Sequence, residues 1–424
     1  MAKRKRSQSR WVIFVRNKKN SSGNISLFLL KDRFFMDGTL LEKYRHNDTS
    51  ITILTKYNPI PTRHIMNTSE LQIENVTHDT LDSIEGATHR DWIKITGRTG
   101  FYRVAYSNDL FSRILDAMRN GEIINPKDRI GLIDDTVALA RAGLYKTSEA
   151  LELLNTCRDE REYAVWATII SALNEIRGIV PNLGALLAFQ EFAQNVLRPA
   201  LSRVGWDKKI GEPDLHGMLR PMLITALGRF EDSPTINEAF EQFGKAHAGF
   251  EISADIRGAV YEIVAIYGNS AVLDRLLALY EHAGDDQEKK RILNALAGAG
   301  CNDESLIERV LEFLMSDKVL TSDAPLVIER MGAHNKPGMI AWNFIKTNWQ
   351  DVVARFHGDG VGKLLPRAIE GLVGSFNHEG MVLEAEEFLG AHPLEGGKNA
   401  FTRALEKARS NVSWKKRALD DFYD

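Results

Sequence analysis

The spacing of hydrophobic and polar positions changes from period two to a helical spacing near residue 105. Before that point, Leu71–Val76 and Trp92–Ile95 alternate apolar and polar residues, which is typical of half-buried strands. Ile51–Thr55 combines β-branched and aliphatic residues, and Pro59 and Pro61 follow it and oppose ladder pairing. The pattern therefore predicts short strands in this part of the chain.

A hairpin signal closes this strand-rich segment. The turn dipeptide Thr99–Gly100 separates Trp92–Ile95 from Phe101–Tyr106, which we predict to be its partner strand. Several strands with turn signals between them favour a small β-sandwich, which we assign to residues 49–106.

Residues 1–48 fit this pattern less well, and we leave them unassigned as a basic head. Trp11–Val15 and Ile25–Leu30 are candidate strands, with a candidate turn at Asn17–Gly23. The basic run Lys3–Arg6 matches a nuclear import signal, and it also matches a solvated, disordered terminus, which is the commoner case.

Helical spacing dominates residues 107–424. Asn125 and Pro126 supply an N-cap and a proline at the first helical position, and Asp128 adds a favourable negative charge in the first turn. Ser253 is predicted to cap a later helix that ends at Gly268. The apolar stripe of that helix comprises Ile256, Val260, Ile263, Val264 and Tyr267.

The predicted helices are short, and polar connectors such as Gly284–Asp286 and Gly300–Asp303 separate them. Similar stripes recur within Val272–Tyr280 and Leu306–Leu314. Many short amphipathic helices with tight turns favour stacked pairs over a long-helix bundle, and the absence of a strict sequence period makes the repeats irregular. The predicted fold class is mainly α: an irregular α-solenoid of the HEAT or armadillo kind, preceded by the small β-sandwich.

Composition restricts the classes of function and compartment. A net charge of −3 argues against a nucleic-acid binder, because neutralising phosphates requires a basic excess. No apolar run reaches the roughly 20 residues that cross a bilayer, so we expect no membrane partner. The basic start lacks the apolar segment of a secretory signal, and the two cysteines, Cys157 and Cys301, fit a reducing compartment. We therefore expect a cytoplasmic protein.

Several sequence blocks follow one another in a recognisable order. The most specific is Trp92–Ile95 with Thr99–Tyr106. It resembles the strand pair at the end of the small β-domain of the zinc aminopeptidases related to puromycin-sensitive aminopeptidase, a gluzincin family. Asp128–Asp135, followed by Ala138–Gly143, resembles the first helix of its α-domain. Further blocks follow in the family's order: Glu162–Tyr163 with Trp166, Ser171–Leu173, Asp255–Arg257 with Val260–Tyr261 and Gly268, and Ala341–Trp349. The resemblance runs from about Ile51 to Trp414, and its order and spacing make it specific.

Two motifs of that family are missing from this sequence. The family binds zinc through His-Glu-x-x-His and a later glutamate, and it grips the substrate's amine through Gly-x-Met-Glu-Asn. None of the 11 histidines stands four residues from another, and the pair His378–Glu379 leads to no second histidine. The resemblance implies that both motifs belong to domains preceding this part of the enzyme. We therefore expect no cofactor in this chain, and zinc only in the family's catalytic domain.

Other catalytic chemistry has weak support in the sequence. His78 and His89 lie among acidic residues, in a segment that a polar loop explains better than a metal site. Neither cysteine belongs to a CxxC pair, and Gly-x-Ser-x-Gly is absent. We assign no catalytic and no metal-binding residue.

Arg257 and Tyr261 are the candidate peptide-binding residues. A cation that reaches a concave surface is suited to holding a peptide carboxylate, and both residues belong to one of the blocks that resemble the family. A purely structural role remains open for each of them.

A second set of residues is assigned to the junction between the β-domain and the first helices. Tyr102, Arg103 and Tyr106 lie along one strand and are predicted to seal it against those helices. Arg129 is predicted to form an ion-pair network with Asp134 and Asp135.

The resemblance also implies a function. In the resembling enzymes, a curved helical domain closes over the catalytic domain and walls off the chamber in which peptides lose their amino-terminal residues. This chain would supply that lid and wall without hydrolysing peptides alone, and its partners would be peptides and a separate catalytic half. Two alternatives remain: an independent α-solenoid module that binds peptides or proteins, and an enzyme whose catalytic domains are encoded upstream of Met1.

Overall fold

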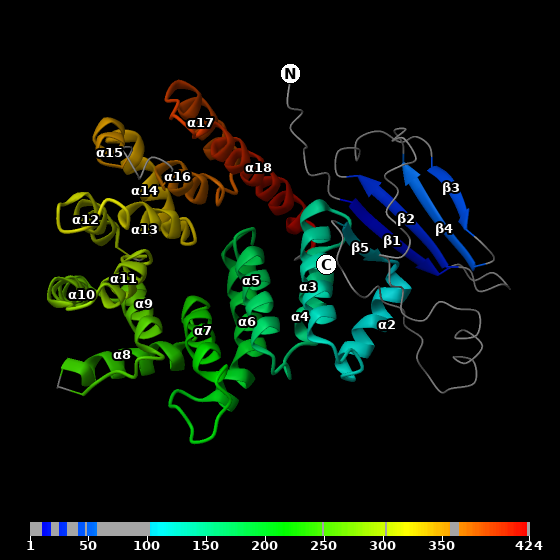
Figure 1. The fold of residues 1–424 in the computed structure, drawn as a ribbon, viewed down its shortest axis with the longest axis horizontal. Helices are drawn as coiled ribbons and strands as arrows, with labels where there is room; N and C mark the ends of the chain where they lie inside the picture. The colour runs from blue at the N-terminus through cyan, green and yellow to red at the C-terminus, as the bar shows by residue number, and fades with distance from the viewer. Residues whose placement is uncertain are drawn as a thin grey trace. The chain divides into compact units, whose positions relative to one another are not determined.

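Helices make up most of the part of the chain that the structure describes, which confirms the prediction of a mainly α fold (Figure 1). The computed structural model describes residues 11–17, 25–31, 41–46, 49–56, 102–247, 250–301, 303–356 and 364–421. Contacts divide the chain into two compact units, unit 1 (Met1–Cys157) and unit 2 (Arg158–Asp424), which we describe separately. The boundaries predicted at residues 48 and 106 fall within unit 1 and remain predictions, because residues 57–101 lie outside the described ranges.

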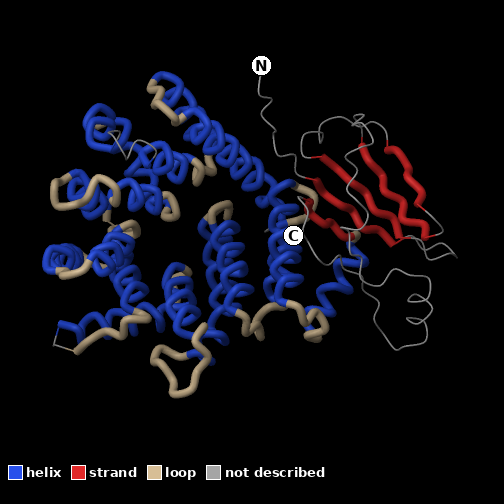
Figure 2. Tube along the Cα trace, viewed as in Figure 1, coloured by secondary structure: helices blue, strands red, loops and turns tan. Residues whose placement is uncertain are grey.

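The described strands of unit 1 form a single mixed sheet with the order β3–β4–β2–β1–β5 (Figure 2). Strand β1 pairs antiparallel with β2 and parallel with β5, and Phe14 lies opposite Phe28 and Ala105. Strand β4 pairs parallel with β2 and antiparallel with β3. The strands are β1 (Trp11–Asn17), β2 (Ile25–Lys31), β3 (Leu41–His46), β4 (Thr49–Lys56) and β5 (Tyr102–Tyr106).

This sheet changes the expectation for the amino-terminal part of the chain. The described strands lie side by side in one sheet, so the described residues do not show two facing sheets of a β-sandwich. The candidate strands Trp11–Val15 and Ile25–Leu30 do form β1 and β2, and they bring residues that we had left unassigned into the sheet. The strands predicted at Leu71–Val76 and Trp92–Ile95 lie outside the described residues.

Capping residues fix the ends of the central helix of unit 1. As predicted, the Asn125 side chain accepts a hydrogen bond from the Lys127 N–H, 3.0 Å away, and Pro126 begins the helix. The helix ends at Gly143, whose φ of 77° requires a residue that tolerates the left-handed region. The described helices of this unit are α2 (Asn108–Arg119), α3 (Pro126–Ala142) and α4 (Thr147–Asn155).

Unit 2 is built from helices in two layers (Figure 1). The inner layer is a row in which α5, α7, α9, α11, α13, α16 and α18 contact one another in succession. Most of the outer helices pack against this row, and α12 packs against α14. The helices are α5 (Tyr163–Arg177), α6 (Leu183–Val204), α7 (His216–Arg229), α8 (Ser233–His247), α9 (Arg257–Tyr267), α10 (Ser270–His282), α11 (Asp286–Leu296), α12 (Glu304–Met315), α13 (Ala324–Met331), α14 (Asn335–Thr347), α15 (Trp349–Phe356), α16 (Leu364–Val373), α17 (Glu379–Ala391) and α18 (Lys398–Asp421).

The apolar stripe predicted for α9 is largely confirmed, but the predicted start of the helix was wrong. Ile256, Val260, Ile263 and Val264 are buried, and Gly268 follows the last helical residue. The helix begins at Arg257, whereas Ser253 opens a preceding turn by accepting hydrogen bonds from the N–H groups of residues 256 and 257. The turn satisfies these N–H groups before regular helix begins.

A buried arginine fixes the connection between α6 and α7. The side chain of Arg220 is fully buried, and its Nη2 lies 2.5 Å from Glu212 Oε2. Its Nε donates to the Gly205 carbonyl at 3.1 Å, and Nη1 lies 3.4 Å from Asp255 Oδ2. Because removing one partner of a buried pair leaves an uncompensated charge, loss of Arg220 would cost about 3–5 kcal/mol.

The two ends of the row in unit 2 meet through a side-chain contact. Asn377, between α16 and α17, donates from Nδ2 to the carbonyl oxygen of Gly178, at the end of α5, over 2.5 Å. Lys415 of α18 donates to Asn377 Oδ1 at 3.2 Å. The bond between Asn377 and Gly178 joins segments 199 residues apart.

Candidate functional site

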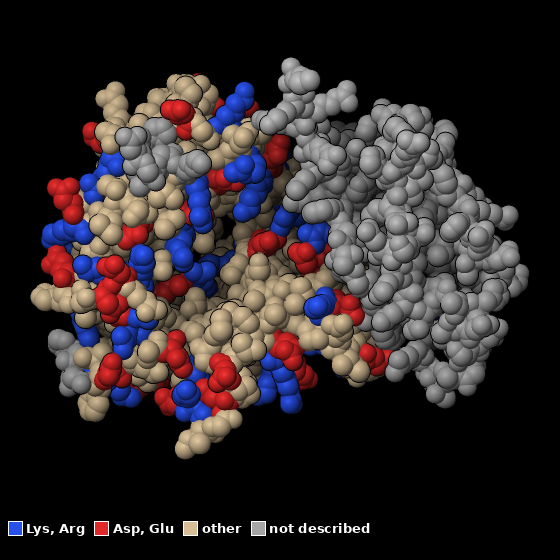
Figure 3. All heavy atoms as spheres, in the orientation of Figure 1, with Lys and Arg blue, Asp and Glu red and all other residues tan. Residues whose placement is uncertain are grey.

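The inner layer of unit 2 borders a hollow that is visible in Figure 3, and Lys and Arg side chains gather along its rim over α16 and α18. None of the described helices is long and apolar enough to span a membrane. The polar side chains of the inner layer are the candidate site residues of unit 2.

The described residues do not offer a zinc site. Among them, no three His, Cys, Asp or Glu side chains converge in a way that could hold a metal ion. His378 occupies the N-cap of α17, and the neighbouring Glu379 pairs with Lys416 at 2.8 Å. This donor set does not fit the zinc that the family resemblance implies, and we derive no chemical step through that metal.

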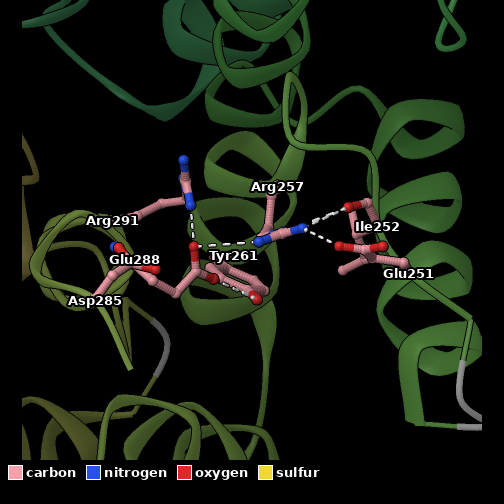
Figure 4. Close-up of polar contacts among 7 residues, drawn as sticks. All are labelled: Glu251, Ile252, Arg257, Tyr261, Asp285, Glu288 and Arg291. Carbon is pink, nitrogen blue, oxygen red and sulfur yellow. Dashed lines mark hydrogen bonds and ion pairs between the residues drawn. The ribbon is translucent and has the colours of Figure 1, made fainter. Parts of the chain in front are cut away.

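Arg257, the predicted peptide-binding cation, is held by groups of its own chain (Figure 4). Its Nη2 lies 3.0 Å from Glu251 Oε1 and donates to the Ile252 carbonyl at 3.1 Å. Its Nη1 lies 3.4 Å from Glu288 Oε2, across the interface between α9 and α11. Its side chain is 21% exposed.

Glu288 is the shared acceptor of this cluster. Tyr261 donates its hydroxyl to Glu288 Oε1 at 3.0 Å, and Arg291 pairs with the other oxygen. Burial, followed by the negative charge and the hydrogen bond of Glu288, raises the pKa of Tyr261 to about 12. The cluster ties α9 to α11, and peptide binding by Arg257 and Tyr261 stays a prediction.

Arg103 and Tyr106 connect β5 to the helices of unit 1. Arg103 pairs with Asp134 and, at 3.1 Å, with Asp135 Oδ1. The second oxygen of Asp135 accepts the Val104 N–H at 2.9 Å. The side chain of Tyr102 lies outside the described residues.

Tyr145 bonds both backbone groups of Tyr106. Its hydroxyl accepts the Tyr106 N–H at 2.5 Å and donates to the Tyr106 carbonyl at 2.9 Å. Burial is the main cause that raises the pKa of this hydroxyl above its ordinary value. These bonds fix the strand end against the segment that follows α3.

Arg129 donates to the carbonyl oxygens of Ile123 and Ile124 at 3.0 and 2.5 Å, in the segment before α3. Arg103 pairs with Asp134 and Asp135, a pairing that the sequence did not indicate. The sequence did not indicate this pairing because Asp134 and Asp135 stand 31 and 32 residues from Arg103 along the chain.

Cys301 and His334 form a polar contact in the inner layer. Cys301 Sγ donates to the Gly298 carbonyl at 3.0 Å and lies 3.9 Å from His334 Nδ1. Burial and the charges of Arg229 and Arg177 lower the pKa of His334 to about 3, and burial raises the pKa of Cys301 to about 11. At neutral pH this is a thiol beside a neutral imidazole and not an activated nucleophile.

Sequence analysis missed a charged groove between α13, α16 and α18. It has a volume of about 600 Å³. Its charged lining residues are Glu329, Arg367, Glu370, Arg403 and Lys407. Helical spacing placed Arg403 and Lys407 on one helix face, and Arg367 and Glu370 on a face of another helix. It did not indicate that the two faces meet.

Comparison with known proteins identifies similarity over most of the chain. The family model of the ERAP1-like C-terminal domain matches residues 92–412. Aminopeptidase M1-A of Oryza sativa subsp. japonica is 32% identical over 337 residues, which cover 76% of this chain and 37% of that protein. Aminopeptidase M1 of Arabidopsis thaliana is 29% identical over 345 residues, covering 79% and 38%. Glutamyl aminopeptidase of Bitis rhinoceros is 29% identical over 329 residues, covering 76% and 34%. The matched part of the chain thus spans little more than a third of the length of these relatives.

Proposed function

The chain belongs to the ERAP1-like C-terminal domain family of M1 aminopeptidases, and from this premise we propose that it forms the helical wall of a peptide chamber in an enzyme that removes amino-terminal residues from peptides. The observation that carries the proposal is the extent of the match. The model of a C-terminal domain matches residues 92–412 of this chain, and the alignment with the rice aminopeptidase covers 76% of this chain but only 37% of that enzyme.

The two-layered order of unit 2 supports a role as a wall. Helices stacked in a row present one continuous face, which suits contact with extended peptides. The finer architecture belongs to the same proposal: an irregular α-solenoid of the HEAT or armadillo kind, preceded by the small β-sandwich assigned to residues 49–106. A cytoplasmic location is also part of it.

In the proposed role this chain binds and encloses the peptide, and the zinc of a separate catalytic half would activate water. This division follows from the sequence, which carries neither His-Glu-x-x-His nor Gly-x-Met-Glu-Asn. The residues of this chain would orient the peptide and exclude water, and peptides and the catalytic half would be its partners.

The test is to add this chain to the part of rice Aminopeptidase M1-A that lies outside the aligned segment. We expect the two parts to form a complex in gel filtration. The rate of hydrolysis of a ten-residue peptide, which is long enough to contact the wall, should change by at least about threefold. Hydrolysis of an aminoacyl anilide, which is too short to reach the wall, should change less. A complex that leaves peptide hydrolysis unchanged would contradict the proposal.

The runner-up is an independent module that binds peptides or proteins. It is favoured by the groove of α13, α16 and α18, which lies within unit 2 and has a volume of about 600 Å³. Peptide binding by the chain alone, together with no complex with the catalytic part, would favour this second function.

A further inference from the structure

The imidazole of His334 is held in one position by the backbone around it. His334 precedes α14, and its side chain makes no capping hydrogen bond to that helix. A Cβ added at Gly298 would lie 3.0 Å from the Cε1 and 3.1 Å from the Nε2 of this imidazole, so the ring lies directly on the Gly298 backbone. The residue is only 6% exposed. The described residues offer its ring no hydrogen-bonding partner other than Cys301.

Cys301 brings a second soft donor to the same place from the segment between α11 and α12. Its Sγ lies 3.9 Å from His334 Nδ1 and donates its hydrogen to the Gly298 carbonyl at 3.0 Å. A thiol has one hydrogen, so that hydrogen does not also satisfy the imidazole. The sulfur and Nδ1 therefore face each other with a gap between them.

The width of this gap fits an ion bound by two donors. Zinc, for comparison, lies about 2.3 Å from a thiolate sulfur and about 2.0 Å from an imidazole nitrogen. Two such bonds separate the donors by about 4.3 Å in a straight line and by about 3.5 Å at a tetrahedral angle. The observed 3.9 Å lies between these limits, so both atoms reach one ion at a wide angle without movement of the backbone.

Two donors select the kind of metal. Structural zinc takes four protein ligands and catalytic zinc takes three, and among the described residues no third His, Cys, Asp or Glu side chain converges here. Cu(I) is a soft ion that thiolates bind strongly, and it accepts two ligands at a wide angle. The pair therefore suits Cu(I) better than Zn²⁺.

The surrounding charges also favour a monovalent ion. The charges of Arg177 and Arg229 act on both donors, and Lys336 acts on the thiol. The opposing carboxylate is Glu262, which pairs with Arg229 at 2.5 Å. A thiolate and a monovalent cation form a neutral unit, whereas a divalent ion would add a positive charge beside these cations.

We propose that Cys301 Sγ and His334 Nδ1 bind one Cu(I) ion between them. Cys301 is half-buried, so the ion reaches the pair from the thiol side. On binding, the thiol proton leaves to solvent, the lone pairs of Sγ and Nδ1 form the two metal bonds, and the imidazole keeps its hydrogen on Nε2. Copper enters and stays as Cu(I), so no electron is transferred. This inference goes beyond the proposed function and does not depend on it.

Competition with a coloured Cu(I) chelator tests the binding. The reduced full chain, kept free of oxygen, is titrated into the Cu(I) complex of bicinchoninate, and we expect it to take one copper per chain. Zn²⁺ should bind at least about 100-fold more weakly. A chain that takes no copper from the chelator, or that binds Zn²⁺ as tightly as Cu(I), would overturn the proposal.

Variants locate the ion on the chain. Cys301→Ser should abolish transfer of copper, and His334→Gln should weaken binding by at least about tenfold, since even loss of a partner of a metal ligand costs about 10–100-fold. Cys157→Ser is the matched control, because Cys157 is the other thiol of the chain and donates to the Leu153 carbonyl at 3.5 Å. Undiminished binding in His334→Gln would show that a lone thiol holds the ion, and an equal loss in Cys157→Ser would place it elsewhere. Either result overturns the proposal.

The X-ray absorption spectrum of the copper-loaded original chain gives a readout that does not depend on the folding of any variant. We expect one sulfur and one nitrogen neighbour of copper. Two sulfur neighbours, or no sulfur neighbour, would contradict the assignment. The proposed function is judged separately by peptide hydrolysis in the complex, so the two ideas can fail independently.

Discussion

Arg257 and Arg403 are both arginines of the inner layer of unit 2, and their surroundings give them different capacities. The guanidinium of Arg257 is 21% exposed and donates to the carbonyl of Ile252 as well as pairing with two glutamates. That of Arg403 is 60% exposed and pairs with one glutamate. A ligand can approach Arg403 without disturbing the backbone, whereas Arg257 holds its helix in place.

The buried His334 predicts a specific dependence of stability on pH. Its pKa is about 3 in the folded chain, because of burial and the neighbouring charges of Arg229 and Arg177, and about 6.5 when unfolded. Between these values the unfolded chain binds a proton that the folded chain does not. The contribution of this residue is therefore fully present above about pH 6.5, and it falls by up to about 1.4 kcal/mol for each pH unit below that.

Urea unfolding at several pH values between 6.5 and 4.5 measures this effect. His334→Gln should flatten the fall in unfolding free energy, because the titrating group is gone. His282→Gln, at an exposed position, should preserve the slope of the original chain. Equal slopes for His334→Gln and the original chain would show that this imidazole does not resist protonation.

Single residues divide into those that sequence could place and those that it could not. Asn125 acts on the N–H of Lys127, two residues away, so the capping pattern was sufficient to predict it. Arg257 acts on Glu288, 31 residues away on another helix, so its hydrogen bonds could not be foreseen from the local pattern. The groove was missed for the same reason, since Glu329 and Arg403 come from helices far apart in sequence.

At the scale of elements, the packing of α13 against α16 depends on two glycines. Gly332→Ala would place a Cβ 2.6 Å from the carbonyl oxygen of Gly371 and 3.1 Å from the Cα of Leu372. These are backbone atoms that cannot rotate away, so we expect a loss of about 1–3 kcal/mol in unfolding free energy.

Gly244→Ala on α8 is the matched control for that change. No heavy atom lies within 4 Å of the added Cβ, so removing a helical glycine should stabilise the chain by about 0.5–1 kcal/mol. Urea denaturation of both variants measures the difference. Effects of the same sign would contradict the close approach of α13 and α16.

The elements themselves were largely predictable, and their boundaries less so. The stripe within Leu306–Leu314 is buried in α12 as its spacing indicates, because helical periodicity is a local property. The sequence pattern placed the start of α9 at Ser253, whereas Ser253 opens a separate turn before the helix. Asp255 in that turn contacts Arg220 of α7, and no local pattern reveals this contact. Strand candidates near residues 11 and 25 were found, but their place in the sheet was not.

At the scale of the whole molecule, short amphipathic helices with brief connectors were sufficient to predict a mainly helical chain. The order of strands in unit 1 was beyond the sequence, because β1 pairs with β5, some 90 residues later in the chain. The bond between Asn377 and Gly178 was equally hidden, since it joins segments 199 residues apart. Long-range contacts of this kind depend on the assembled fold and leave no periodic signal.

The proposed division between chamber wall and catalyst is tested on the purified full chain alone, after incubation with zinc and removal of the excess. We expect well below one zinc per chain by elemental analysis and no release of product from an aminoacyl anilide above buffer. One tightly held zinc per chain, with turnover that a chelator abolishes, would contradict the claim that this chain is the wall of a peptide chamber and not its catalyst.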